Sequence, residues 1–395
     1  MVSTICRARE LKVNKAGADR PLKLVFLGGG VNSAIGRMHF ISSQLDRKFE
    51  VVGGMFSRDR LIQESTESYY KINNPIDFGN LENFAHKSDQ FDAVVILTPT
   101  PLHFEAIEFM IQQDIPIICE KAFVSNFHES KKVLELLRSK PIKNLVTFNY
   151  TGFPMVRLMQ HMVMNGQIGK PVNIRIAMPQ EGFIKINPST GKVNLPQDWR
   201  RKDGEVPTVL LDLAVHCLHL GSFITNENPS EVFARFKHHA QVESVIDDVE
   251  VLAEYPSEML GSFWFTKSAL GKQNGLSVEI YGTEGSLTWV QEFPNALTFA
   301  DKYGEIRILK FGQNLPIINE ARYERFKPGH PSGFTEAFAN FYWDAASYLI
   351  GESSNLTNTS LSPSMQVASR GFDIIRSMVE SNTTSTWRKV EYSYE

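Results

Sequence analysis

Between residues 21 and 150 the chain alternates short apolar runs with segments of helical spacing. Runs of Val, Ile, Leu and Phe without regular polar positions are typical of strands buried on both faces of a parallel sheet. The helical segments between them supply the crossover connections that parallel strands need. The predicted strands are Leu22–Leu27, Phe49–Phe56, Ala93–Thr98, Ile115–Cys119 and Leu145–Phe148. Residues 21–150 are therefore expected to form a doubly wound α/β domain.

The rest of the chain has longer and more closely spaced predicted strands. With 395 residues the chain is long enough for two domains, since one domain usually holds roughly 100–200 residues. Turns such as Tyr281–Gly285 favour hairpins and an antiparallel sheet. After a helix beginning near Pro154, the predicted strands are Val172–Ala177, Val232–His238, Val249–Tyr255, Met259–Thr266, Leu276–Tyr281 and Ser286–Val290, followed by helices Phe334–Ile350 and Pro363–Val379. Residues 151–395 are therefore expected to form an α+β domain with a large, mostly antiparallel open sheet.

Charge and composition exclude several classes of protein. The 41 basic and 44 acidic side chains leave a formal net charge of −3, which would not draw the protein to nucleic acid or an anionic membrane. The cysteines Cys6, Cys119 and Cys217 lack the dense, even pattern of small secreted domains, so a cytoplasmic location is expected. Residues 1–20 contain no apolar run of signal-peptide length and are expected to form a flexible leader. Charged and imidazole side chains interrupt the most apolar stretch, residues 206–225, so no membrane span is predicted.

A glycine-rich loop follows the first predicted strand and leads into a predicted helix. It reads Gly28-Gly29-Gly30-Val31-Asn32-Ser33-Ala34-Ile35-Gly36. Glycines at this place let the backbone approach a pyrophosphate at the helix N-terminus. The loop therefore predicts a Rossmann-type dinucleotide site that includes Gly28, Gly30, Asn32, Ile35 and Gly36. Five residues, rather than two, separate Gly30 from Gly36, so a plain tight turn is the alternative interpretation.

The end of the second predicted strand bears on the choice of cofactor. An acidic residue there would bind the ribose hydroxyls of NAD, but this strand ends in Phe56-Ser57-Arg58-Asp59. The Ser57 hydroxyl and the Arg58 guanidinium suit a 2′-phosphate, which a carboxylate would repel. NADP(H) is therefore favoured, while Asp59 leaves NAD(H) possible.

Further polar residues follow the third and fourth predicted strands. The third continues into Thr98, Pro99 and His103, and the fourth continues into Glu120-Lys121. Doubly wound sheets bind ligands at these strand ends, so we predict that these residues contact the cofactor. A surface ion pair is the alternative interpretation of Glu120-Lys121.

Asp212 and His216 form a second candidate pair. They lie four residues apart in a predicted helix over Leu210–Phe223, so they are expected to share one helix face and to act as a unit. Histidines and a cysteine nearby also raise the possibility of zinc: His216, Cys217, His219, His238 and His239. Adjacent residues point to different faces of a helix, so we predict no metal site and expect Cys217 to pack as a small hydrophobe.

These motifs together resemble the glucose-fructose oxidoreductase, inositol dehydrogenase and rhizopine-catabolism (Gfo/Idh/MocA) family. In order along the chain, the resemblance rests on the glycine-rich loop, on Thr98, Pro99 and His103, on Glu120-Lys121, and on Asp212 with His216. It covers about residues 21 to 390. The segments Asn149–Arg157 and Pro328–Phe334 are similar to those of one subgroup of sugar dehydrogenases.

The resemblance implies hydride transfer between a nicotinamide and a secondary alcohol of a sugar, cyclitol or nucleotide-sugar bound between the two domains. By analogy His216 would move the hydroxyl proton, Lys121 would stabilise the developing alkoxide, and Asp212 would orient the imidazole or hold another substrate hydroxyl. Glu120 and Tyr150 would border the nicotinamide and the sugar, and Trp199 with Arg200 would match a family pair near the substrate. The family's open sheet commonly mediates association, which implies a homodimer or homotetramer.

Several residues depart from the family pattern. Ala122 replaces the proline after the lysine, and Ala214 and Val215 replace smaller residues before His216. The segment Gly204–Val209 is bulkier than the usual glycine-rich stretch. These departures motivate two alternatives: a dinucleotide-binding regulator without catalytic activity, and a glycosidase that uses NAD for transient oxidation.

Overall fold

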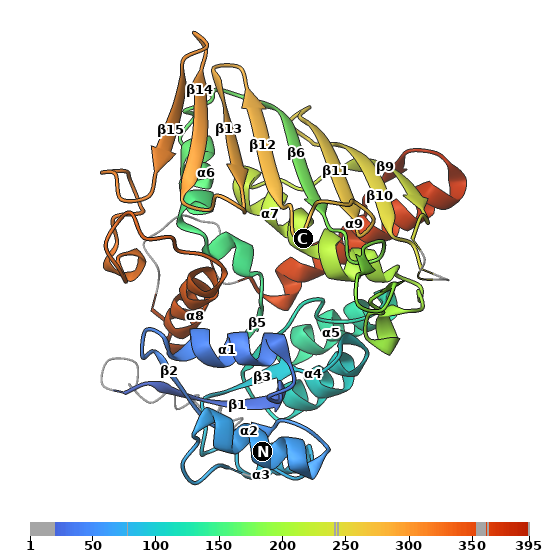
Figure 1. The fold of residues 1–395 in the computed structure, drawn as a ribbon. Helices are drawn as coiled ribbons and strands as arrows, with labels where there is room; N and C mark the ends of the chain where they lie inside the picture. The colour runs from blue at the N-terminus through green and yellow to red at the C-terminus, as the bar shows by residue number, and fades with distance from the viewer. Residues whose placement is uncertain are drawn as a thin grey trace, which may run out of the picture.

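The computed structural model of this chain describes residues 20–76, 78–240, 242, 245–352, 361 and 363–393. Apart from Arg20, the expected leader lies outside these residues. Within the described ranges no helix combines the length and the apolar character needed to cross a membrane. The described residues form two large sheets with helices between and around them (Figure 1).

The first sheet is parallel, as predicted. Its order is β2-β1-β3-β4-β5, and every neighbouring pair in it is parallel. The strands are β1 (Leu22–Gly28), β2 (Phe49–Met55), β3 (Ala93–Leu97), β4 (Ile117–Cys119) and β5 (Asn144–Val146). The helices that connect them are α1 (Ala34–Gln44), α2 (Arg60–Tyr70), α3 (Glu82–His86), α4 (His103–Gln112) and α5 (Phe127–Ser139). The near-continuous burial of β3 and β4 accounts for their unbroken apolar sequences.

The second sheet has nine strands in the order β15-β14-β13-β12-β6-β11-β10-β9-β16. Among the neighbouring strands of this sheet in the described residues, only β6 and β11 are parallel. This confirms the predicted mostly antiparallel sheet. Its strands are β6 (Pro171–Pro179), β9 (Glu231–Lys237), β10 (Asp248–Glu254), β11 (Leu260–Thr266), β12 (Ser277–Gly282), β13 (Gly285–Val290), β14 (Ala296–Asp301), β15 (Ile306–Lys310) and β16 (Arg388–Lys389). The prediction stopped at Val290 and missed β14, β15 and β16. Strand β15 is an exposed edge, so burial imposes no strong apolar pattern on it.

Helices α6 (Pro154–Met164), α7 (Val215–Thr225) and α9 (Met365–Thr384) lie between the second sheet and the first (Figure 1). Helix α9 packs on β9 and also on α5 and β5, so it bridges the two sheets. A small hairpin of β7 (Ile186–Asn187) and β8 (Lys192–Val193) lies outside both sheets.

Helix α8 (Phe334–Ile350) begins and ends where the sequence predicts, but it packs against α1. Its Phe338, Phe341 and Tyr342 share a hydrophobic core with residues of β1 and β2. We therefore propose a division into residues 21–150 and 151–395 in which α8 returns to cover the first sheet.

A buried ion network connects α8 to α6. The Asp344 carboxylate on α8 accepts hydrogen bonds from Arg157 on α6 and from Arg322. Arg157 also donates from Nε to the Thr151 carbonyl oxygen at 2.7 Å. Because an unpaired buried charge is costly, this network holds the segment around Thr151, which carries Tyr150, in one place.

Candidate active site

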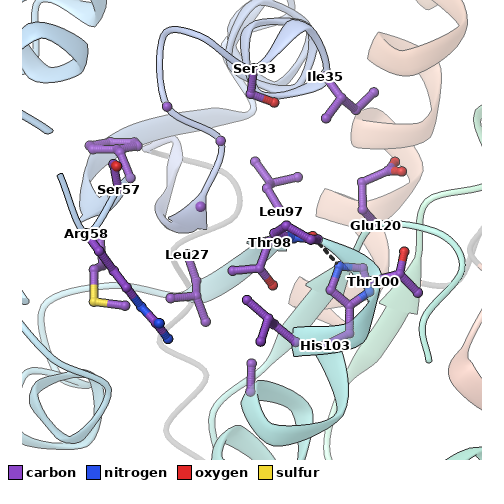
Figure 2. A pocket seen from close by; sticks show the side chains of 18 of the residues that line it. Leu27, Ser33, Ile35, Ser57, Arg58, Leu97, Thr98, Thr100, His103 and Glu120 are labelled. Atoms are coloured by element: carbon purple, nitrogen blue, oxygen red, sulfur yellow. Dashed lines mark hydrogen bonds between the residues drawn. The ribbon is translucent and has the colours of Figure 1, made fainter. Parts of the chain in front are cut away.

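A cavity of about 770 Å³ lies at the C-terminal ends of the parallel strands (Figure 2). This volume is within the usual range for cofactor and small-molecule sites. Most of the residues predicted to bind the cofactor or substrate line it: Gly28, Gly30, Asn32, Ile35, Ser57, Arg58, Thr98, Pro99, His103, Glu120, Lys121, Trp199 and Arg200. Gly36, Tyr150, Asp212 and His216 are not among its lining residues.

The glycine-rich loop has a backbone that other residues would not adopt easily. Gly28 and Gly29 have φ angles of +87° and +76°, and a Cβ atom on Gly28 would lie 2.7 Å from the Leu97 backbone. A Cβ on Gly30 would lie 3.1 Å from the Ile62 side chain, on a surface that lines the cavity. The loop therefore leaves bare backbone at the start of α1, the arrangement that a pyrophosphate requires.

Gly36 has a packing role at this loop. A Cβ atom on it would lie 2.4 Å from the Gly29 carbonyl oxygen, so its missing side chain lets α1 approach the loop. The Ser33 hydroxyl caps α1 by accepting from the Gly36 amide at 3.1 Å. The five-residue spacing is therefore compatible with a tight loop-to-helix turn.

The end of β2 presents Ser57 and Arg58 to the cavity, while Asp59 is engaged elsewhere. The Asp59 carboxylate caps α2 by accepting from the amides of Leu61 at 2.8 Å and Ile62 at 3.3 Å. The exposed Arg58 side chain has no hydrogen-bond or ion-pair partner among the described residues, and Figure 2 shows it beside Ser57 at the cavity. A guanidinium is therefore free at the cavity in the segment after β2, whereas the neighbouring Asp59 carboxylate is committed to a helix cap.

His103 connects the loops that follow β3 and β4. Its Nε2 and Nδ1 atoms lie 2.7 Å from the Thr98 carbonyl oxygen and 2.9 Å from the Ala122 carbonyl oxygen. Burial lowers the pKa of His103. The peptide bond between Lys121 and Ala122 is cis, although alanine stands where the family has proline.

Lys121, which follows β4, and Asp212, which precedes α7, form a direct ion pair. Lys121 Nζ donates to Asp212 Oδ1 at 2.7 Å and to the Asp212 carbonyl oxygen at 2.9 Å. Arg200 also donates to Oδ1 at 3.3 Å, and Lys267 Nζ donates to Oδ2 at 2.5 Å. Burial alone would raise the pKa of Asp212, but attraction to Lys121, Lys267 and Arg200 outweighs it and holds the pKa well below its ordinary value.

The segment that carries Asp212 differs from the predicted single α-helix. Leu210–Ala214 forms a π-helical turn, and α7 begins only at Val215. The π turn bonds residues five apart, so the helical hydrogen-bond pattern changes between residues 212 and 216. No hydrogen bond joins Asp212 to His216 in the described structure, and cations occupy both carboxylate oxygens instead.

His216 is 6% exposed and lies beside Tyr150. The two rings meet edge to face with centroids 4.7 Å apart, and the Tyr150 hydroxyl accepts from Asn274 at 3.3 Å. Within the described residues, His216 Nδ1 is buried and has no hydrogen-bond partner. Burial, followed by the positive charge of Lys121, lowers the pKa of His216 well below its ordinary value. A neutral imidazole with a spare nitrogen can exchange a proton with a ligand.

Trp199 and Arg200 belong to a short 3₁₀ turn, Asp198–Arg200. Trp199 Nε1 donates to Gln197 Oε1 at 2.8 Å, and the Arg200 guanidinium lies 4.6 Å from the centre of the Trp199 ring. Both line the cavity, so they form its wall on the side of the second sheet.

Sequence reasoning missed two charged or titratable residues at this site. Lys267 follows β11 directly, and its position after a buried strand end could have indicated it. His39 lies on the buried face of α1, with Nε2 3.2 Å from Glu120 Oε1 and Nδ1 2.6 Å from the Tyr342 hydroxyl. A histidine within an apolar helical stripe gives no sign of its partner, because α8 supplies Tyr342 from far along the chain.

Near His216, Cys217 is a buried core residue and His219 is half-buried. Burial raises the pKa of the Cys217 thiol and lowers the pKa of His219 to about 3. The His219 ring stacks on Phe148 with centroids 4.2 Å apart. Among the described residues, no three histidine, cysteine or acidic side chains gather in a group that could hold a metal ion.

Two family models match the chain. The model described as "Oxidoreductase family, NAD-binding Rossmann fold" matches residues 22–148. The model described as "GFO/IDH/MocA C-terminal domain" matches residues 156–288. The first match covers the glycine-rich loop and Lys121, and the second covers Asp212, His216 and Lys267.

Individual relatives agree with these matches. The chain is 25% identical over 390 residues to an uncharacterized oxidoreductase, YfiI, of Bacillus subtilis, covering 93% of this chain and 97% of the relative. It is 26% identical to levoglucosan dehydrogenase of Pseudarthrobacter phenanthrenivorans, covering 52% of this chain and 57% of that enzyme. A crystal structure of an inositol dehydrogenase homolog from Azotobacter vinelandii, complexed with NADH and myo-inositol, has the same fold, with a TM-score of 0.83 and 21% identity over 95% of this chain and all of its own.

Substitution Gly36→Ala tests the loop-to-helix packing. Alanine normally stabilises a helix by about 0.5–1 kcal/mol relative to glycine, but here its Cβ meets the Gly29 carbonyl. We expect Gly36→Ala to lower NAD(P)H affinity at least about tenfold, measured by fluorescence titration. Gly371→Ala in α9, where a Cβ would meet nothing within 4 Å, is the matched control and should bind normally. Unchanged affinity in Gly36→Ala would contradict a pyrophosphate site formed by the glycine loop and the start of α1.

Proposed function

The chain belongs to the Gfo/Idh/MocA family of NAD-binding Rossmann oxidoreductases, and from this premise we propose that it oxidises or reduces a secondary alcohol of a sugar, cyclitol or nucleotide-sugar. One observation carries the proposal. Lys121, at the rim of the cofactor cavity, is paired with Asp212 in the segment that leads to a buried, neutral His216. This combination provides a cation and a proton acceptor beside a dinucleotide site.

The residues that line the cavity would bind the dinucleotide. The bare backbone of Gly28 to Gly30 and the start of α1 would hold the pyrophosphate, and Thr98, Pro99 and Glu120 would border the nicotinamide end. When bound, the dinucleotide supplies the hydride acceptor or donor. Trp199 and Arg200 would cover the outer wall and exclude water from the reacting groups.

Lys121, Asp212 and His216 supply the catalytic half. In the oxidative direction the substrate loses a hydride from carbon and a proton from its hydroxyl, and His216 would accept that proton. Lys121 would donate a hydrogen bond to the same oxygen and stabilise the negative charge that develops on it. Asp212 holds the lysine ammonium through two contacts, so its role is to position Lys121. Reduction would use the same groups in reverse.

The cofactor that the site favours is NADP(H). Arg58 is free of ion pairs in the described structure and lines the cavity at the end of β2, where a 2′-phosphate would lie. Asp59, the carboxylate that would suit NAD(H), is committed to the cap of α2. A guanidinium gives a charge-assisted contact with phosphate that the ribose hydroxyls of NAD(H) cannot provide.

We also propose that the protein associates as a homodimer or homotetramer through the open face of the nine-stranded sheet. Helices α6, α7 and α9 cover one face of this sheet, and Leu252 and Leu260 are about half exposed on strands β10 and β11. Exposed apolar residues on an uncovered sheet are typical of a surface that a second copy covers.

Substitution Lys121→Ala tests the electrostatic role. If the ammonium stabilises charge in the transition state, kcat should fall by about two orders of magnitude or more. The measurement is steady-state turnover of a polyol substrate, with circular dichroism to check folding. Lys132→Ala, which removes a half-exposed lysine on α5, should leave turnover unchanged. Near-normal turnover of Lys121→Ala would exclude this mechanism.

The pH dependence of oxidation tests His216. The imidazole must be neutral to accept a proton, and its pKa lies well below the ordinary value of about 6.5. A lowered pKa keeps the group neutral until the pH falls through that lower value. We therefore expect kcat/KM for oxidation to stay level from neutral pH through about 6.5 and to fall only at lower pH. An acid limb centred at or above about 6.5 that disappears in His216→Asn would show that burial does not depress this pKa.

Substitution Arg58→Ala tests the cofactor preference. The wild-type protein should bind NADPH at least about tenfold more tightly than NADH, a difference of about 1.4 kcal/mol. Arg58→Ala should remove most of this difference by weakening NADPH alone, as measured by fluorescence titration. Arg60→Ala, two residues away with a side chain that is 90% exposed, is the control and should keep the preference. Tighter binding of NADH by the wild type would refute the NADP(H) proposal.

A further inference from the structure

Three cations surround the carboxylate of Asp212, and one of them is the proposed catalytic Lys121. Lys121, Lys267 and Arg200 all pair with Asp212, which is their only ion-pair partner among the described residues. The side chains of Lys121, Lys267 and Asp212 are only 14%, 10% and 13% exposed. The cluster therefore carries a surplus of positive charge in a place where water screens it poorly.

Lys267 has no part in the mechanism proposed above. It lies at the end of β11, and its remaining polar contact is with Gln180 Oε1 at 3.3 Å. Its ammonium also lies 5.3 Å from the centre of the Phe183 ring. Neither contact neutralises the charge of the Lys267 ammonium. One carboxylate thus faces two buried lysines, and the excess positive charge raises the free energy of the folded protein unless an anion compensates it.

The neighbouring carboxylates are engaged with other groups. Glu120, which precedes Lys121, lies 3.2 Å from His39 Nε2. Glu181, next to Gln180, pairs with Lys185 and accepts from the Gly271 amide. Asp203 accepts from the amides of Thr208 and Ile246. None of these carboxylates pairs with a cation of the cluster in the described structure.

Two side chains in or next to this cluster each have a polar atom without a partner among the described residues. Arg200 Nε and His216 Nδ1 are both buried without a hydrogen bond among the described residues. His216 as a whole is 94% buried, since 6% of its surface is exposed. Buried polar atoms are nearly always paired in folded proteins, so these two mark hydrogen-bonding capacity beside the cluster that the described residues do not satisfy.

We propose that the substrate of this site is an anionic sugar or cyclitol, whose negative group is bound by Lys267 and Arg200 close to the carbon that reacts. This inference rests on the proposed function and narrows its substrate class. A carboxylate, as in a uronic acid, and a phosphate ester share the chemistry that the cluster recognises. Arg200 offers a planar donor face and Lys267 a compact charge, so both suit an anion better than a neutral hydroxyl. Lys121 remains available for the reacting oxygen.

Binding to the NADH-loaded or NADPH-loaded full chain tests the inference by isothermal titration calorimetry. Each of glucose, galactose and mannose is compared with its own uronate, which differs only at C6, and with its own 6-phosphate. We expect at least one anion to bind tenfold or more tightly than its parent hexose, and we expect the advantage to shrink as salt is added. The preferred series, uronate or phosphate, identifies which anion the site takes. Equal or weaker binding of every anion would overturn the inference.

Substitutions of Lys267 and Arg200 test whether these two residues bind the anionic group. Lys267→Met should reduce the advantage of the anion at least tenfold while hexose binding changes little, and Lys267→Arg should restore most of it. Lys272→Met, an exposed lysine in the segment after β11, is the matched control and should behave as wild type. If Lys267→Met fails to fold, Arg200→Met serves in its place, with Arg201→Met, a half-exposed neighbour, as its control. An anion advantage that survives both Lys267→Met and Arg200→Met would overturn the inference.

Failure of this inference is distinguishable from failure of the proposed function. Oxidation of neutral polyols with no preference for anions would keep the oxidoreductase and discard the anion site. Binding of an anion without its oxidation, in a chain that also oxidises no other polyol, would keep the anion site and discard the proposed reaction.

Discussion

The ion pairs of Asp212 join four segments that are far apart in the chain. Lys121 follows the parallel strand β4, Arg200 lies in a 3₁₀ turn, Asp212 lies in the π turn before α7, and Lys267 follows the antiparallel strand β11. A buried carboxylate is costly alone and is tolerated when paired with cations. The ion pairs of this one side chain therefore connect the C-terminal end of β4 in the first sheet to the C-terminal end of β11 in the second. The proposed active site lies where these strand ends meet.

Backbone geometry determines the cofactor side of the site. Gly28 and Gly29 adopt positive φ angles, and His103 connects the turns after β3 and β4 through two carbonyl oxygens. These features shape the cavity at the glycine loop and at the ends of β3 and β4. Its charged lining residues are Arg58, Glu105, Glu120, Lys121 and Arg200. In the proposed complex, backbone would hold the middle of the dinucleotide and side chains would recognise its two ends.

Much of this arrangement could be predicted, because local patterns carry it. The buried strands of the first sheet have continuous apolar sequences, and the residues at their C-terminal ends had to share one edge. The ion pairs of Asp212 with Lys121 and Lys267 could not be predicted, because the three residues come from segments far apart in the sequence. The partner of His39 was equally hidden, because Tyr342 arrives from α8. The periodicity of a helix or strand indicates which residues of that element share a face, but it does not indicate contacts between elements far apart in the chain.

The sequence by itself determined the class of the two sheets and the family resemblance, and it singled out the glycine loop, Lys121, Asp212 and His216 as candidates. These follow from hydrophobic period, from residues that only a particular backbone tolerates, and from motifs at strand ends. Only the tertiary structure decided that Asp59 caps a helix, that α8 covers the first sheet and that Lys267 is a third cation on Asp212. The reason is physical: the charge balance of a site is a sum over segments distant in the chain, and only folding brings those segments within a few ångströms.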